Sequence, residues 1–162
     1  MLGVIYLFKR QYDQALSEAQ RGIALDPNGA SGYEVLSSIM NNTEKRVEAF
    51  DLAEKAMRLD PRNHDHYLYL EGWSYTQMGR YEESIPILKR NLASNPNNLA
   101  SHYLLAVDYI ELGREPQARA EAAEILRISP NFSVDAFISQ FPNKDEAYKE
   151  RASTDLHKAG LK

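Results

Sequence analysis

The residues of this 162-residue chain with the most reactive side chains are four histidines and several paired carboxylates. His64 and His66 are the nearest approach to a metal-binding pair, but a spacing of two residues does not by itself aim both rings at one ion. The chain has no cysteine, which removes disulfides, thiolate nucleophiles and cysteine zinc sites. His102 and His157 have no evident acid or nucleophile partner in the sequence. We therefore expect no catalytic residues, no metal and no cofactor on this chain.

Other common chemistries are also missing from the sequence. There is no glycine-rich phosphate loop and no G-x-S-x-G serine motif. The net charge is −4 with no basic block, so composition gives no reason to expect nucleic acid as a partner. No apolar run approaches the roughly 20 residues of a membrane span, so we expect no direct membrane insertion. Carboxylates such as Glu82 and Glu83 are expected on solvated helix faces.

The elements that position these side chains follow a regular period. Four prolines stand 34, 35 and 34 residues apart, namely Pro27, Pro61, Pro96 and Pro130. Twelve residues before each proline is a small residue, namely Ala15, Ala49, Ser84 and Ala118. The clearest unit, 66–96, has apolar residues at helical spacing in two stretches, with a break at Gly79 between them. Neither helix can bury its apolar stripe alone, so each unit needs neighbours.

A period of 34 residues with two helices per unit resembles the tetratricopeptide repeat. The glycine–tyrosine pair of that family matches at Gly3 and Tyr6 and again at Gly72 and Tyr75. The resemblance implies an all-α, right-handed superhelical stack of antiparallel helix hairpins with C-terminal capping helices. The expected repeats, the first with a truncated first helix, and the expected cap are 1–29, 30–63, 64–98, 99–130 and 131–162.

The period is lost after Pro130. We expect one helix to start at Ser133 and a second to start in a capping box of Asn143 and Glu146. Repeat stacks need a terminal unit that covers the last apolar face, and this segment fits that role. Its sequence, from P-N-F-S-V to the closing L-x-K-A-G-L, is similar to the C-terminal ends of certain bacterial proteins. In those proteins a class III adenylate/guanylate cyclase domain or a winged-helix domain precedes a repeat array.

That similarity implies that the chain is the C-terminal part of a larger bacterial signalling protein whose catalytic residues lie elsewhere. A cytoplasmic location is favoured, or a periplasmic one if the parent carries an upstream membrane span. The first helices of tetratricopeptide repeats line a groove that binds protein or peptide ligands. Carried over by position, the groove residues are Glu34, Ser38, Asn41, His66, Tyr69, Trp73, Thr76, Gln77, Tyr103, Val107, Ile110 and Glu111.

The aromatic residues in this set are typical of binding hot spots, because they bury much area at small entropic cost. Glu34 and Glu111 would give the groove an acidic rim that favours a ligand with Lys or Arg. Two alternatives stay open. The patch either binds a partner or packs against the tail of its own chain or a neighbouring turn.

The run Met1–Phe8 carries no charged side chain. Its apolar residues would lack part of their cover if the first helix is truncated, which predicts a self-association edge and a homodimer. The edge residues are Leu2, Val4, Ile5, Leu7 and Phe8. We therefore predict a non-enzymatic protein-interaction or assembly module. The alternatives are a regulatory segment that senses a small molecule in the groove and a structural spacer that self-associates.

Overall fold

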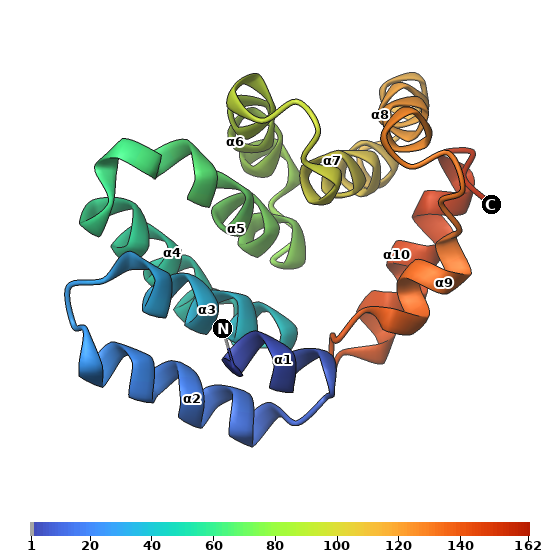
Figure 1. Cartoon of the computed structure of the whole chain (residues 1–162). Coiled ribbons are helices and arrows are strands. Elements are labelled where there is room, and N and C mark those ends of the chain that lie inside the picture. The colour runs from blue at the N-terminus through green and yellow to red at the C-terminus, as the bar shows by residue number, and fades with distance from the viewer. Residues whose placement is uncertain (1) are drawn as a thin grey trace.

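A computed structural model describes residues 2–162, and this part of the chain contains helices but no strand (Figure 1). The helices are α1 (Leu2–Phe8), α2 (Tyr12–Leu25), α3 (Ala30–Asn42), α4 (Arg46–Leu59), a 3-10 turn (Pro61–Asn63), α5 (His64–Gln77), α6 (Tyr81–Ser94), α7 (Leu99–Glu111), α8 (Glu115–Ile128), α9 (Val134–Gln140) and α10 (Glu146–Lys158). Helices α1 to α8 pair as four successive hairpins. The hairpins stack into an arc with α3, α5 and α7 on its inner side (Figure 1). The structure confirms the predicted all-α stack of helix hairpins.

The turn inside each hairpin depends on one residue with left-handed backbone geometry. In the third and fourth hairpins this residue is Gly79 (φ 72°) and Gly113 (φ 70°), which adopt that geometry without strain. In the first and second hairpins the same position holds Arg10 (φ 58°) and Glu44 (φ 65°). The turn is therefore kept where glycine is absent, at some cost in backbone strain.

The two helices of each hairpin approach closely at the small residues that mark the period. Ala15, Ala49, Ser84 and Ala118 are all fully buried. A methyl group built on Gly72 would lie 2.4 Å from Leu88 Cδ2, so a larger side chain cannot enter the third hairpin there. Where one partner is serine, its hydroxyl bonds the opposite helix. Ser37 Oγ donates to the Ala49 carbonyl (2.7 Å), and Ser84 Oγ donates to the Gly72 carbonyl (3.0 Å).

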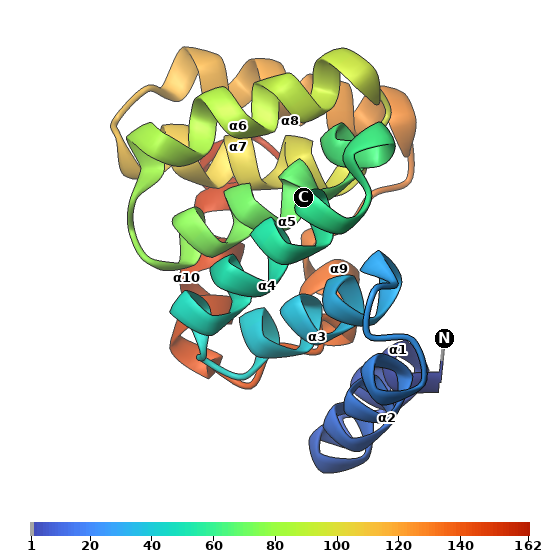
Figure 2. The same ribbon diagram turned by 90° about the vertical axis from the view of Figure 1, so that its left-hand side faces the viewer.

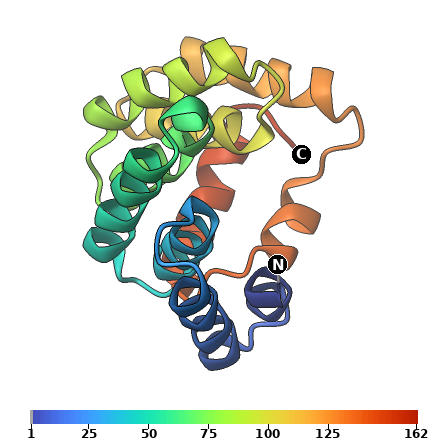
Figure 3. The same cartoon turned by 60° about the vertical axis from the view of Figure 1, so that its left-hand side comes forward.

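The C-terminal segment (131–162) does not extend the stack. It crosses the inside of the arc and returns to the first hairpin, as Figures 2 and 3 show. Tyr12 donates to the Pro142 carbonyl (3.1 Å), and Arg10 donates to the Ser139 carbonyl (3.0 Å). The Lys144 amide donates to the Asn42 carbonyl (2.8 Å) in the second hairpin.

The segment packs on one helix of the last hairpin, as expected of C-terminal capping helices. Helix α10 packs on α7 and not on the outer helix α8, where Leu126 stays 39% exposed. The segment buries aromatic surface on the inner helices, where Phe137 and Phe141 pack on Trp73 and Tyr103. Burying that surface is more favourable than covering one exposed leucine.

The two helices of the segment start differently from one another. Ser133 Oγ accepts from the Ala136 amide (3.4 Å), which confirms the predicted start of α9. Asp145, and not Asn143, caps α10 by accepting from the Tyr148 amide (3.0 Å). The predicted capping box is therefore wrong, because Asn143 is buried with its amide group directed at Gln77 (3.4 Å).

The close approach in the fourth hairpin predicts a clear mutational contrast. Ala122 is 4% exposed, whereas its neighbour Ala123 is exposed. Ala122→Leu should lower the free energy of unfolding in urea by roughly 1–3 kcal/mol, because the added atoms overpack the hairpin. The control Ala123→Leu should change it by less than about 0.5 kcal/mol. Equal unfolding curves for the two variants would show that the helix register is wrong.

Candidate functional site

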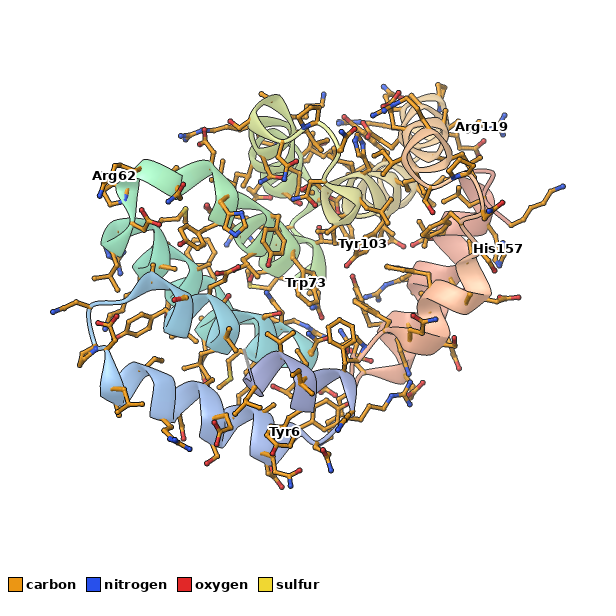
Figure 4. All side chains as sticks on the ribbon, in the orientation of Figure 1. Tyr6, Arg62, Trp73, Tyr103, Arg119 and His157 are labelled. Atoms are coloured by element: carbon orange, nitrogen blue, oxygen red, sulfur yellow. The ribbon has the colours of Figure 1, made fainter. Side chains whose placement is uncertain are left out.

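An aromatic cluster on the inner side of the arc joins α5 and α7 to the C-terminal segment. Trp73 and Tyr103 both point toward the middle of the arc (Figure 4). The Phe141 ring lies 6.0 Å from Trp73 and 6.1 Å from Tyr103, and Phe137 lies 5.0 Å from Tyr103, between ring centroids. Tyr148 of α10 adds a further ring, 6.2 Å from Phe141. These centroid distances are those of favourable aromatic pairs.

The cluster decides between the two alternatives for the predicted groove. Trp73 is 7% exposed, Tyr103 5% and Val107 2%, so these residues do not line an open groove. The patch packs against the tail of its own chain. The prediction of an open groove around Trp73 is therefore wrong for this structure, because Phe137 and Phe141 already cover the aromatic surface.

Three of the predicted groove residues hold the helices together. Thr76 faces α6, where its hydroxyl bonds that of Ser84 (3.0 Å). Asn41 accepts from Ser74 Oγ (3.1 Å) between α3 and α5. Gln77 donates to the Asn41 carbonyl (2.7 Å) and accepts from Asn143 of the C-terminal segment. These three side chains are therefore occupied by contacts within the chain.

The remaining predicted groove residues lie around the cluster. Glu34 and His66 approach to 3.3 Å, and both are accessible to solvent. Glu111 is exposed and accepts from the Tyr81 hydroxyl (3.0 Å). Ile110 is half-buried against the aromatic core.

A pocket of about 330 Å³ remains between the C-terminal segment and the inner helices. Its lining includes the predicted groove residues Ser38, Tyr69 and Trp73 and is mostly apolar. The half-buried Tyr69 is the predicted groove aromatic that stays partly open to solvent. A mostly apolar hollow of this size with a few polar groups is typical of a binding site.

The predicted self-association edge is divided between two hollows. Leu7 is 2% exposed, and with Val4 and Phe8 it lines the inner pocket. Leu2 lines a second hollow of about 420 Å³ between α1, α2 and α3. Leu2, Ile5 and Phe8 are 53%, 47% and 62% exposed, and Leu25 beside the second hollow is 78% exposed.

The contact between α7 and α10 contains two buried carboxyl groups that the sequence did not reveal. Asp108 is fully buried, and neither of its carboxylate oxygens has a hydrogen-bond partner among the described residues. Burial raises the pKa of Asp108 to about 7, with the nearby Ser84 and Thr76 hydroxyls opposing the rise only in part. Asp155 of α10 is also buried, and burial together with the neighbouring Glu111 raises its pKa. The only sequence signal for Asp108 is an acid within the apolar run of α7.

The histidines have structural contacts. His102 bonds Glu121 (2.6 Å) and the Pro96 carbonyl (3.1 Å), so it does have the acidic partner that the sequence did not reveal. Burial lowers the pKa of His102, but the Glu121 and Pro96 contacts outweigh it and raise the pKa overall. Within residues 2–162 no group of three or more His, Asp or Glu side chains is arranged to hold a metal ion. In the same range no helix has the length and apolar character to cross a bilayer.

Comparison with known families shows which family the chain belongs to. Residues 43–125, just over half of the chain, match the family described as anaphase-promoting complex, cyclosome, subunit 3. Residues 1–28 match the tetratricopeptide repeat. Both are families of tetratricopeptide-repeat proteins, and the chain belongs to the tetratricopeptide-repeat family.

Individual relatives agree with this assignment. The peroxisomal targeting signal receptor of Komagataella phaffii (strain GS115 / ATCC 20864) is 33% identical over 93 residues, and its counterpart in Komagataella pastoris matches equally well. The match covers 57% of this chain but 16% of the receptor, so the chain spans a small part of these curated relatives.

Solved structures are similar in fold. A thermophilic tetratricopeptide-repeat protein of Thermus thermophilus superposes with a TM-score of 0.70 at 23% identity, covering 96% of this chain and 78% of its own. For pilF of Pseudomonas aeruginosa the TM-score is 0.70 at 22% identity, covering 99% of this chain and 74% of the pilF chain. For MamA of Desulfovibrio magneticus RS-1 it is 0.66 at 17% identity, with 98% and 89% covered. At these identities the likeness shows the fold alone.

The buried Asp108 carboxyl predicts how stability depends on pH. Its pKa is about 7 in the folded chain against an ordinary value of 3.8, so the folded state holds the proton more tightly. Stability should therefore be greater at low pH and fall as the pH rises from about 4 through 7. For this group alone the loss between pH 5 and pH 8 is roughly 2–3 kcal/mol. In urea unfolding, the Asp108→Asn variant should lose less stability between pH 5 and pH 8 than the wild-type chain does. An unchanged pH dependence in the variant would contradict the raised pKa of Asp108.

Proposed function

We propose that this chain is a non-enzymatic protein-interaction module, and that its partner-binding surface is the inner face of α5 and α7. The observation that carries the proposal is that this face already binds an aromatic polypeptide segment, the chain's own residues 131–162. A face that binds such a segment within the chain has the chemistry to bind one from a partner. Helix-in-groove recognition of this kind is a common mode of peptide binding.

The polar surroundings indicate what kind of segment would fit. Glu34 near the start of α3 and Glu111 at the end of α7 are both accessible to solvent. An acidic rim favours a ligand with Lys or Arg beside its apolar residues. The curated relative is, by its name, a receptor for a targeting signal, which agrees with a peptide-binding role.

A peptide-display selection against the full chain tests the proposed function. Selected peptides should contain aromatic and basic residues, and they should bind the Tyr69→Ala variant roughly tenfold more weakly. Tyr69 lines the inner pocket and is only half-buried, so this variant should keep its fold. The control is Tyr75→Ala on the same helix, because Tyr75 packs against Phe50 of α4 (5.1 Å). Absence of any binder, or binders that ignore Tyr69→Ala, would contradict the proposal.

A second candidate function is self-association through the first hairpin. The exposed apolar side chains of Leu2 and Leu25, which line the second hollow, and of Ile5 in α1 favour it. Sedimentation should then show a concentration-dependent dimer that Ile5→Lys dissociates. The control Val47→Lys changes an apolar residue that is 66% exposed on α4, and it should leave the dimer intact. A monomer at all concentrations would refute this candidate.

Two further proposals concern a small-molecule ligand and the parent protein. The inner pocket of about 330 Å³ favours a small apolar molecule as an alternative ligand. The likeness of residues 131–162 to the ends of cyclase and winged-helix proteins supports a parent protein of the bacterial signalling class. The reading frame upstream of Met1 tests the second proposal, since a cyclase or winged-helix domain should be encoded there.

A further inference from the structure

We propose that the C-terminal segment is a displaceable latch, which occupies the inner face until a partner segment with two aromatic residues and a following Lys or Arg replaces it. This inference rests on the proposed function, because it names the competitor for the same face and the chemistry of the ligand. It follows from three features of the contact between residues 131–162 and the inner helices.

The first feature is incomplete filling. The segment leaves a pocket of about 330 Å³ beside its own Phe137 and Phe141 rings. The pocket is open to solvent, so the segment does not cover the inner face completely. A segment with larger side chains at these two places would bury more of Tyr69 and Trp73 than the latch does.

The second feature is a set of buried polar atoms without partners. The indole nitrogen of Trp73, the hydroxyl of Tyr148, both carboxylate oxygens of Asp108 and one of Asp155 are buried and have no hydrogen-bond partner among the described residues. Trp73 and Asp108 belong to the inner face, whereas Tyr148 and Asp155 belong to the latch. Burying such groups unpaired costs free energy, so the docked latch is weaker than its aromatic contacts alone would make it.

The third feature is a mismatch of charge. The latch places Asp155 against Glu111 of α7, with Asp108 nearby in the same helix. The cation closest to Asp155 is Lys158 of the latch itself, 3.6 Å away. A Lys or Arg at the position of Asp155 would pair with Glu111, whereas the latch places a second carboxyl group against it. The fitting partner segment therefore has aromatic residues spaced like Phe137 and Phe141, with a basic residue about fourteen positions after the second.

The latch is also held by contacts that a partner need not break all at once. Asp145 forms an ion pair with Arg46, and the segment is bonded to the first hairpin through Tyr12. These contacts lie toward the N-terminal hairpins, and Asp145 holds the start of α10. Release can therefore begin at the C-terminal part of α10, where Asp155 lies against Glu111.

The test uses the full chain and a fluorescently labelled synthetic peptide with the sequence of residues 131–162. The open variant is Phe137→Ala with Phe141→Ala, and Phe50→Ala is the matched control. The peptide should bind the open variant roughly tenfold or more tightly than the wild-type chain or the control, because the wild-type face is already occupied. Binding should also shield Trp73, the single tryptophan, from acrylamide quenching.

A second peptide, with Asp155→Lys, should bind the open variant severalfold more tightly than the native peptide at pH 8. If the open variant does not fold, Asp155→Lys within the full chain replaces it, and this variant should bind the native peptide more weakly than wild type does. Equal affinities for wild-type and open chains, or no gain from Asp155→Lys, would overturn the latch. Failure of the proposed function is distinguishable from this result, since then no peptide would bind even the open variant.

Discussion

The structure depends on the close approach of two helices at small residues within each hairpin. Alanine or serine at the repeating position brings the backbones together, and the facing helix has glycine, serine or alanine there. Ser37 and Ser84 show the constraint most clearly, because each hydroxyl bonds a carbonyl of the opposite helix. Without these contacts the hairpins would separate, and the stack would lose the inner side on which the proposed partner binding depends.

A stack built in this way produces a surface that it cannot itself cover. The first helix of each hairpin uses one side for its partner and turns the other side inward. In α5 and α7 that inward side carries Trp73 and Tyr103, which need apolar cover. The C-terminal segment supplies it with Phe137 and Phe141 but brings Asp155 against Glu111. The fit is good for aromatic rings and poor for polar groups, as expected of a segment that must also be able to leave.

Features that repeat along the chain could be predicted from the sequence, whereas contacts between residues far apart in the sequence could not. The hairpins could be predicted because Pro27 and its equivalents, and Ala15 and its equivalents, recur at one period, so local geometry repeats. The path of residues 131–162 could not, because it depends on rings far apart in sequence, such as Trp73 and Phe141. The same holds for His102, whose acidic partner Glu121 comes from the next helix, and for Asp108, which lies against Ser84 and Thr76 of the preceding hairpin.

The most direct test of this account is native-state hydrogen exchange of the full chain, which compares the backbone amides of α10 with those of α5 and α7. If the C-terminal segment is a releasable occupant of the inner face, amides of α10 should exchange through a local opening that leaves α5 and α7 protected. Their opening free energy should lie well below that of global unfolding. If α10 exchanges only when the whole chain unfolds, the segment is a permanent part of the core and the central claim is wrong.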